Sequence, residues 1–150
     1  ARHGKPQVHP LIADAIGTMF DDARGRSDAI EQTDDPRAAL KAYVDFYLSP
    51  AHRDRRERGC PLPTLSGDLA RSGEQQRERF GKGVEALTMR LAKALAGIGI
   101  ADPHAEGSAM LAQMVGAVAL SRAVADPAQS DAILADARTL LVARYGLEKR

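Results

Sequence analysis

The chain has 150 residues, of which 44% are hydrophobic and 27% charged, a balance typical of a globular protein and not of a disordered or membrane chain. Lys and Arg number 21 and Asp and Glu 20, so the formal net charge of +1 offers no basic field for nucleic-acid phosphates, and we expect no DNA binding by this chain alone. The single cysteine excludes an internal disulfide, no run of residues is apolar and long enough to cross a bilayer, and no signal segment is found, features that favour a cytoplasmic protein without membrane contact.

Helical spacing of apolar residues recurs from end to end, whereas no alternating pattern predicts a strand. We therefore predict an all-α fold of about six helices. The expected helices cover 10–25, 36–49, 62–71, 74–95, 103–124 and 130–145. Residues 10–150 would form one domain, with 1–9 as a residual or disordered segment.

Local signals mark several of these boundaries. Asp35 is a suitable N-cap for the second helix with Pro36 in its first turn, and Pro50 is expected to end that helix. The charged stretch 51–59 is interpreted as a solvated connector. The dipeptide 126–127, Asp-Pro, is expected to end the fifth helix.

Two glycines inside the fourth helix, Gly81 and Gly83, each cost about 1 kcal/mol relative to alanine. They indicate a bend or the close approach of a neighbouring element.

The helix over 103–124 is apolar on almost every side, so it must be covered on two faces. One account makes it the central helix of a monomeric bundle. The other pairs it and the last helix with their symmetry mates in a four-helix seam of a homodimer. The expected interface residues are Ala109, Ala112, Gly116, Ala119, Ala123, Ile133, Leu140 and Leu141.

Motifs for metal, nucleotide or serine-nucleophile chemistry are absent from the sequence, so we expect no cofactor, no metal and no enzymatic activity. Cys60, beside the start of the third expected helix, has two interpretations. It is a small buried side chain, or it is a reactive thiol for which His52 would be the only nearby base.

Three stretches in order, "GCPLPTLSGDLARSG", "RFGKGVEALTMRLAKAL" and "GAVALSRAVADPAQSDAILADAR", resemble the effector-binding and dimerisation domain of TetR-family transcriptional regulators. The resemblance covers about Pro10 to Tyr145. It implies a bacterial regulator, usually a repressor, whose helical domain dimerises through its last two helices and binds a small molecule. Operator DNA would be contacted only through an amino-terminal helix-turn-helix head, for which just ten residues stand before Leu11. The chain would then be a fragment of a longer regulator, or a regulator-like domain without DNA binding.

The resemblance also implies a cavity beside the short helix that follows Cys60, suited to a small hydrophobic or aromatic effector. The residues expected to line it are Met19, Phe20, Tyr43, Tyr47, Cys60, Thr64, Phe80, Met110, Gln113 and Met114. Each could equally belong to the core. Two other functions stay open: a structural dimerisation module with a filled core, and a small helical enzyme that uses Cys60.

Overall fold

The computed structural model describes residues 9–56 and 60–148, and the described part of the chain is all-α, as predicted, with no strand. It contains seven helices, one more than expected. They are α1 (His9–Glu31), α2 (Pro36–Tyr47), α3 (Pro50–Asp54), α4 (Pro61–Leu69), α5 (Glu74–Gly97), α6 (Pro103–Ala123) and α7 (Pro127–Arg144). No described helix is both long and apolar enough to span a membrane.

The additional helix, α3, lies in the stretch that we interpreted as a connector. Ser49 caps it, because its Oγ accepts the backbone N–H of His52 at 3.1 Å. Pro50 occupies the first turn, where a proline needs no N–H partner. The proline expected to end α2 therefore begins the next helix, while residues 57–59 of the connector lie outside the described residues.

The last helix also begins earlier than predicted, for the same reason. Asp126 caps α7 by accepting the backbone N–H groups of Ala128 and Gln129, at 3.3 and 3.2 Å, and Pro127 follows in the first turn. The Asp-Pro pair thus starts α7. The equivalent prediction for Asp35 is confirmed, since its carboxylate accepts the N–H of Ala38 at 3.0 Å.

α1 extends well past Gly25, where we expected it to fade. Ile30 is packed in the core and Ser27 is buried, so the second half of the helix has its own buried face. Arg24 and Asp28 add an i, i+4 ion pair at 3.4 Å.

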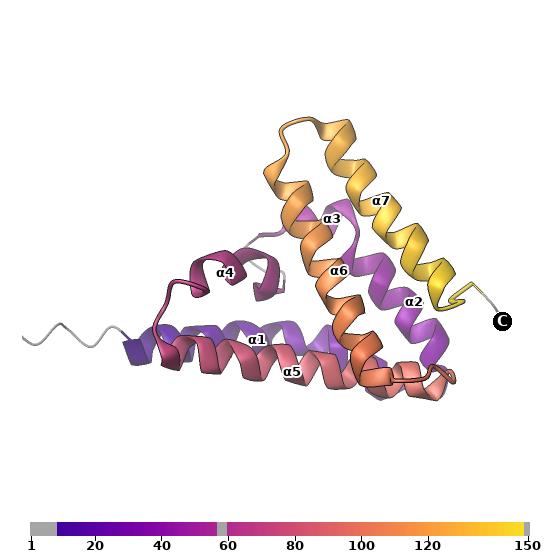
Figure 1. Cartoon of the computed structure of the whole chain (residues 1–150), viewed down its shortest axis with the longest axis horizontal. Helices are drawn as coiled ribbons and strands as arrows, with labels where there is room; N and C mark the ends of the chain where they lie inside the picture. The colour runs from indigo at the N-terminus through magenta and orange to yellow at the C-terminus, as the bar shows by residue number, and fades with distance from the viewer. Residues whose placement is uncertain (1–8, 57–59, 149–150) are drawn as a thin grey trace, which may run out of the picture.

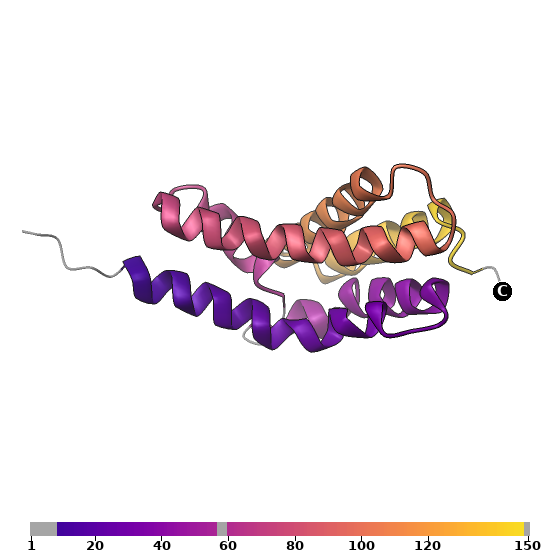
Figure 2. The same cartoon turned by 90° about the horizontal axis from the view of Figure 1, so that it is seen from below.

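The two longest helices, α1 and α5, lie side by side over most of their length (Figures 1 and 2). α6 leans against α5, and α7 packs beside α6 and against α2. Gly107 sets the distance between α5 and α6, because a Cβ there would lie 3.0 Å from the backbone atoms Ala92 N and Thr88 O. Met110, Met114 and Val118, the bulkier stripe of α6, are fully buried.

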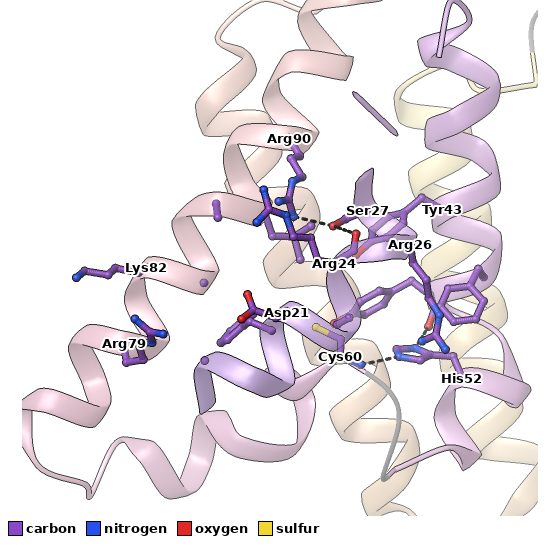
Figure 3. A pocket seen from close by; sticks show the side chains of 18 residues that line it. Asp21, Arg24, Arg26, Ser27, Tyr43, His52, Cys60, Arg79, Lys82 and Arg90 are labelled. Atoms are coloured by element: carbon purple, nitrogen blue, oxygen red, sulfur yellow. Dashed lines mark hydrogen bonds between the residues drawn. The ribbon is translucent and has the colours of Figure 1, made fainter. Parts of the chain in front are cut away.

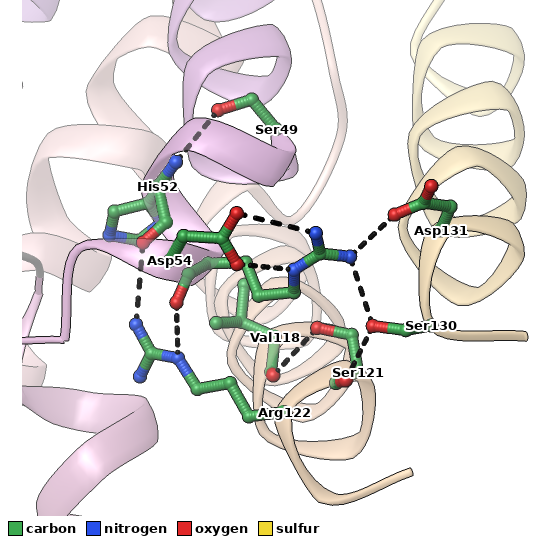
Figure 4. A network of polar contacts seen from close by, with 9 residues as sticks. Ser49, His52, Asp54, Val118, Ser121, Arg122, Ser130 and Asp131 are labelled. Carbon is green, nitrogen blue, oxygen red and sulfur yellow. Dashed lines mark hydrogen bonds and ion pairs between the residues drawn. The ribbon is translucent and has the colours of Figure 1, made fainter. Parts of the chain in front are cut away.

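A polar network fixes α3 against α6 and α7 (Figure 4). Arg122 donates to the backbone oxygens of Arg53 at 2.9 Å and His52 at 3.4 Å. Arg53 in turn donates to Ser130 and Asp131, at 2.9 and 2.6 Å. These bonds hold His52 in place, and His52 belongs to the cavity described next.

Candidate functional site

A cavity of about 240 Å³ lies between α1 and α5, and α2, α3 and the N-cap of α4 complete its wall (Figure 3). It is largely apolar and partly open to solvent. Its lining residues are Gly17, Phe20, Asp21, Ala23, Arg24, Arg26, Ser27, Tyr43, Phe46, Tyr47, His52, Cys60, Arg79, Lys82, Gly83, Ala86, Leu87 and Arg90.

Aromatic rings of α2 form one wall of the cavity. Tyr43 and Tyr47, one helical turn apart, have ring centroids 5.8 Å from each other. The His52 ring follows at 4.6 Å from Tyr47 and 5.1 Å from Phe46. Tyr43 and Tyr47 are both buried, because α2 presents this face to α1 and α5. The rings are tilted against one another by 42° to 54°, so the wall is aromatic but uneven.

Phe20 of α1 contributes to the opposite part of the wall, where α5 carries a glycine. A Cβ at Gly83 would lie 2.4 Å from the Phe20 ring, so only glycine leaves room for the ring in this position. Phe80 meets Phe20 edge-on with ring centroids 5.8 Å apart. The close approach expected at Gly83 is confirmed, whereas Gly81 has no neighbour within 4 Å.

The tyrosine hydroxyls are neutral hydrogen-bonding groups in the cavity. Burial raises the pKa of both Tyr43 and Tyr47 above its ordinary value. The Tyr47 hydroxyl is buried without a well-formed hydrogen bond to any described residue. Only the Cys60 thiol, a weak partner, lies beside it. A hydroxyl whose one neighbouring partner is a thiol keeps unused hydrogen-bonding capacity.

Cys60 and His52 lie together but do not form a thiolate–imidazole pair. His52 Nδ1 is 2.7 Å from the Tyr47 carbonyl oxygen, so Nδ1 carries the ring proton and donates it. Nε2 accepts the backbone N–H of Cys60 at 3.2 Å. Burial lowers the pKa of His52 and raises the pKa of the Cys60 thiol. Both ring nitrogens are thus occupied, and neither group is poised for nucleophilic catalysis.

The cavity is rich in basic side chains, a feature that our sequence reading missed. Its lining includes Arg24, Arg26, Arg79, Lys82 and Arg90 against a single carboxylate, Asp21. The missed signal was the spacing on α5, where positions 79, 83, 86 and 90 share one helix face. That face becomes informative only when α1 is known to lie against it.

Four of the ten residues expected at the pocket line this cavity: Phe20, Tyr43, Tyr47 and Cys60. Phe80 supports Phe20 from behind, and Met19 is partly buried outside the lining. Met110 and Met114 are instead fully buried core residues, because they face α5 and α7. Thr64 and Gln113 are exposed away from the cavity, and Thr64 accepts a hydrogen bond from Arg122 at 3.1 Å.

The residues expected at a dimer interface are mostly accessible in the single chain. Ala109, Ala112, Ala123 and Leu140 are exposed, and Gly116, Ala119 and Ile133 are partly buried. Leu141 does not suit the predicted interface, since its side chain is 1% exposed and packs into the chain's own core. Leu120, which we did not name, is 59% exposed on the same side of α6 as Ala123 and Gly116.

No protein-family model and no curated protein sequence matches the chain.

Proposed function

We propose that this chain is the ligand-sensing and dimerisation domain of a TetR-like transcriptional regulator, with the cavity between α1 and α5 as its effector site. The observation that carries the proposal is this cavity of about 240 Å³, which contains a buried Tyr47 hydroxyl without a well-formed hydrogen bond. A small, mostly apolar hollow with a few convergent polar groups has the character of a small-molecule site. In a purely structural module, side chains would fill this cavity, because protein interiors are closely packed.

The accessible face of α6 and α7 supports the dimerisation half of the proposal. Leu120 and Leu140 are 59% and 64% exposed, among the few large apolar side chains of the described residues that are so accessible. The alanines and Gly116 around Leu120 would let a second helix approach closely. A Cβ added at Gly116 would have no atom within 4 Å, so the surface there is open.

The position of the cavity suggests how binding would be transmitted. α1 and α5 form its long walls, so a ligand between them distinguishes one separation of these helices from another. A ligand shifts a conformational equilibrium only by binding one state more tightly. In a TetR-like repressor, α1 would connect to an amino-terminal helix-turn-helix head, and its displacement would release operator DNA.

Native mass spectrometry of the purified chain at several concentrations tests this proposal. We expect a dimer at twice the chain mass of 16.1 kDa, carrying a labile small-molecule adduct or taking one up from a bacterial metabolite extract. A monomer at every concentration would contradict the dimerisation half. A dimer that never takes up an adduct would favour the structural module instead.

A further inference from the structure

We propose that the effector is an organic acid, whose acid group is bound by Arg79 of α5 and whose apolar body lies against the aromatic wall of α2. This inference rests on the proposed function of the cavity and adds the chemical class of its ligand. It narrows the small hydrophobic or aromatic effector expected from the sequence to an amphipathic anion.

Two of the cavity cations, Arg24 and Arg90, already have carboxylate partners. Arg90 is already engaged: it donates to Ser27 Oγ at 2.7 Å and lies 3.4 Å from Asp28 and 4.0 Å from Glu31. Arg24 shares Asp28 at 3.4 Å. These two arginines are compensated by carboxylates of α1, so they do not call for an anion from outside.

Arg26 has a different role, since its guanidinium lies over the Phe46 ring, 4.7 Å from the centroid. Arg79 and Lys82 differ from the other three cations, because neither forms an ion pair or hydrogen bond with the described residues. They stand three residues apart on α5, at the end of the cavity opposite Arg26 and His52 (Figure 3).

Arg79 is also held close to the cavity wall. A Cβ at Gly17 of α1 would lie 2.5 Å from its Nη2, so the absence of a side chain at Gly17 makes room for the guanidinium. Both residues line the cavity. An arginine in this position offers the planar pair of N–H donors that matches a carboxylate.

The second, independent observation lies deeper in the cavity. The Tyr47 side chain is 1% exposed and its hydroxyl has no well-formed hydrogen bond, although it belongs to the lining. This hydroxyl is itself fully buried beside the Cys60 thiol, so a ligand reaches it only if the Tyr47 side chain shifts. The cavity therefore has an acid-binding group at one end and the rings of Tyr43 and Tyr47 along its inner wall.

The size of the cavity limits the ligand. About 240 Å³ corresponds to roughly eight water molecules at about 30 Å³ each. A single-ring or short-chain carboxylic acid fits this volume. A cationic ligand is disfavoured because Arg79 and Lys82, the two lining cations without a described ion pair, face one lining carboxylate, Asp21.

The test compares two ligands of nearly identical shape, 4-phenylbutyrate and its uncharged amide, by isothermal titration calorimetry on the whole chain. We expect the acid to bind about two- to fivefold more tightly than the amide, because an ion pair to the solvent-exposed Arg79 guanidinium contributes less than a buried one. Added salt should reduce this difference, because Arg79 is at the exposed end of the cavity.

Substitutions of Arg79 test whether this residue causes the difference in affinity between the acid and the amide. Arg79→Ala should lower the affinity for the acid to that for the amide and leave the amide unaffected, and Arg79→Gln should do the same. The matched control is Arg77→Ala, which removes an equal charge from an exposed position of α5 outside the cavity. It should leave both affinities unchanged. Far-UV circular dichroism verifies that each variant is folded.

Two outcomes would overturn the inference, and they differ in what they say about the proposed function. If the acid and the amide bind equally and Arg79→Ala changes neither, the effector is not selected as an acid, while the cavity remains a ligand site. If neither compound binds the folded chain at millimolar concentration, the cavity is not a site for small aromatic acids and the inference falls, whereas adduct uptake in native mass spectrometry still decides the ligand-sensing function.

Discussion

Gly83 shows how one residue shapes the cavity. Its missing side chain leaves room for the Phe20 ring, which a Cβ would approach to 2.4 Å. Phe20 lies between α1 and α5 and meets Phe80 edge-on. The ring therefore keeps its position only because α5 carries no side chain there.

The comparison of Gly83→Ala with Gly81→Ala tests this close approach. Gly81 has nothing within 4 Å of a Cβ, so alanine there should raise the free energy of unfolding by about 0.5 to 1 kcal/mol through helix propensity alone. Alanine at position 83 must displace Phe20, and we expect that variant to be about 1 to 3 kcal/mol less stable than Gly81→Ala. Urea denaturation measures both. Equal stabilities would show that the ring moves aside without cost.

His52 makes the stability of the chain depend on pH. Its ring is neutral in the folded state because burial lowers its pKa below the usual 6.5. In the unfolded chain, the His52 ring takes up a proton as the pH falls through about 6.5. The free energy of unfolding should therefore be constant above this pH and decrease below it, by up to about 1.4 kcal/mol per pH unit. The carboxyls Asp45 and Glu106 have lowered pKa values, so they lose their charge only at more acidic pH.

Urea denaturation at pH 7.5, 6.5 and 5.5 measures this dependence. The His52→Gln variant should be less stable than the original chain at pH 7.5, since it breaks the bonds to Tyr47 and Cys60, but its stability should change less between pH 6.5 and 5.5. An identical pH dependence in both proteins would show that His52 is not the titrating group.

Among the helix contacts, the one between α5 and α6 leaves very little room for an added side chain at Gly107. A methyl group at Gly107 would lie 3.0 Å from backbone atoms of α5, which cannot rotate away as a side chain can. We expect Gly107→Ala to lower the free energy of unfolding by about 1 to 3 kcal/mol. Gly116→Ala, on the open side of the same helix, should instead stabilise the isolated chain by up to about 1 kcal/mol. Thermal unfolding at low protein concentration separates the two, and a stabilised Gly107→Ala protein would contradict the packing.

The elements also show what the sequence could predict. Apolar periodicity identified the helices from α1 to α7 except α3, whose five residues are too few to show a period. Two of the remaining errors came from proline, which ends one helix and begins another with the same local signal, and a third came from Gly25, which does not end α1. Pro50 and Pro127 both stand in a first turn after a capping residue, Ser49 or Asp126.

The site was less predictable than the fold because it depends on which helix faces lie together. Tyr43 and Tyr47 were found from the apolar face of α2 and the family resemblance. Arg79 could not be, since on the sequence it is one more charged residue of an amphipathic helix. Met110 and Met114 were misplaced because a fully buried residue and a cavity residue have the same pattern until the packing is known.

At the scale of the whole molecule, the open face of α6 and α7 predicts a dimer that depends on Leu120 and Leu140. Replacing both by glutamate should give a monomer with unchanged helix content, because both side chains are exposed in the single chain. The control is Met89→Glu, which places the same charge at an exposed apolar position of α5, away from this face, and should leave the dimer intact. Sedimentation velocity reports the masses. A double variant that remains dimeric would place the interface elsewhere.

If the cavity between α1 and α5 binds a small molecule, as we propose, the chain's three tyrosines report the binding directly. Tyr43 and Tyr47 line the cavity, whereas Tyr145 lies outside it and donates its hydroxyl to Glu106 at 2.7 Å. NMR spectra of the chain with ¹³C-labelled tyrosine rings, titrated with 4-phenylbutyrate, should show saturable shifts of the Tyr43 and Tyr47 signals and none for Tyr145. If none of the three signals shifts, or if Tyr145 alone shifts, the cavity is not the binding site.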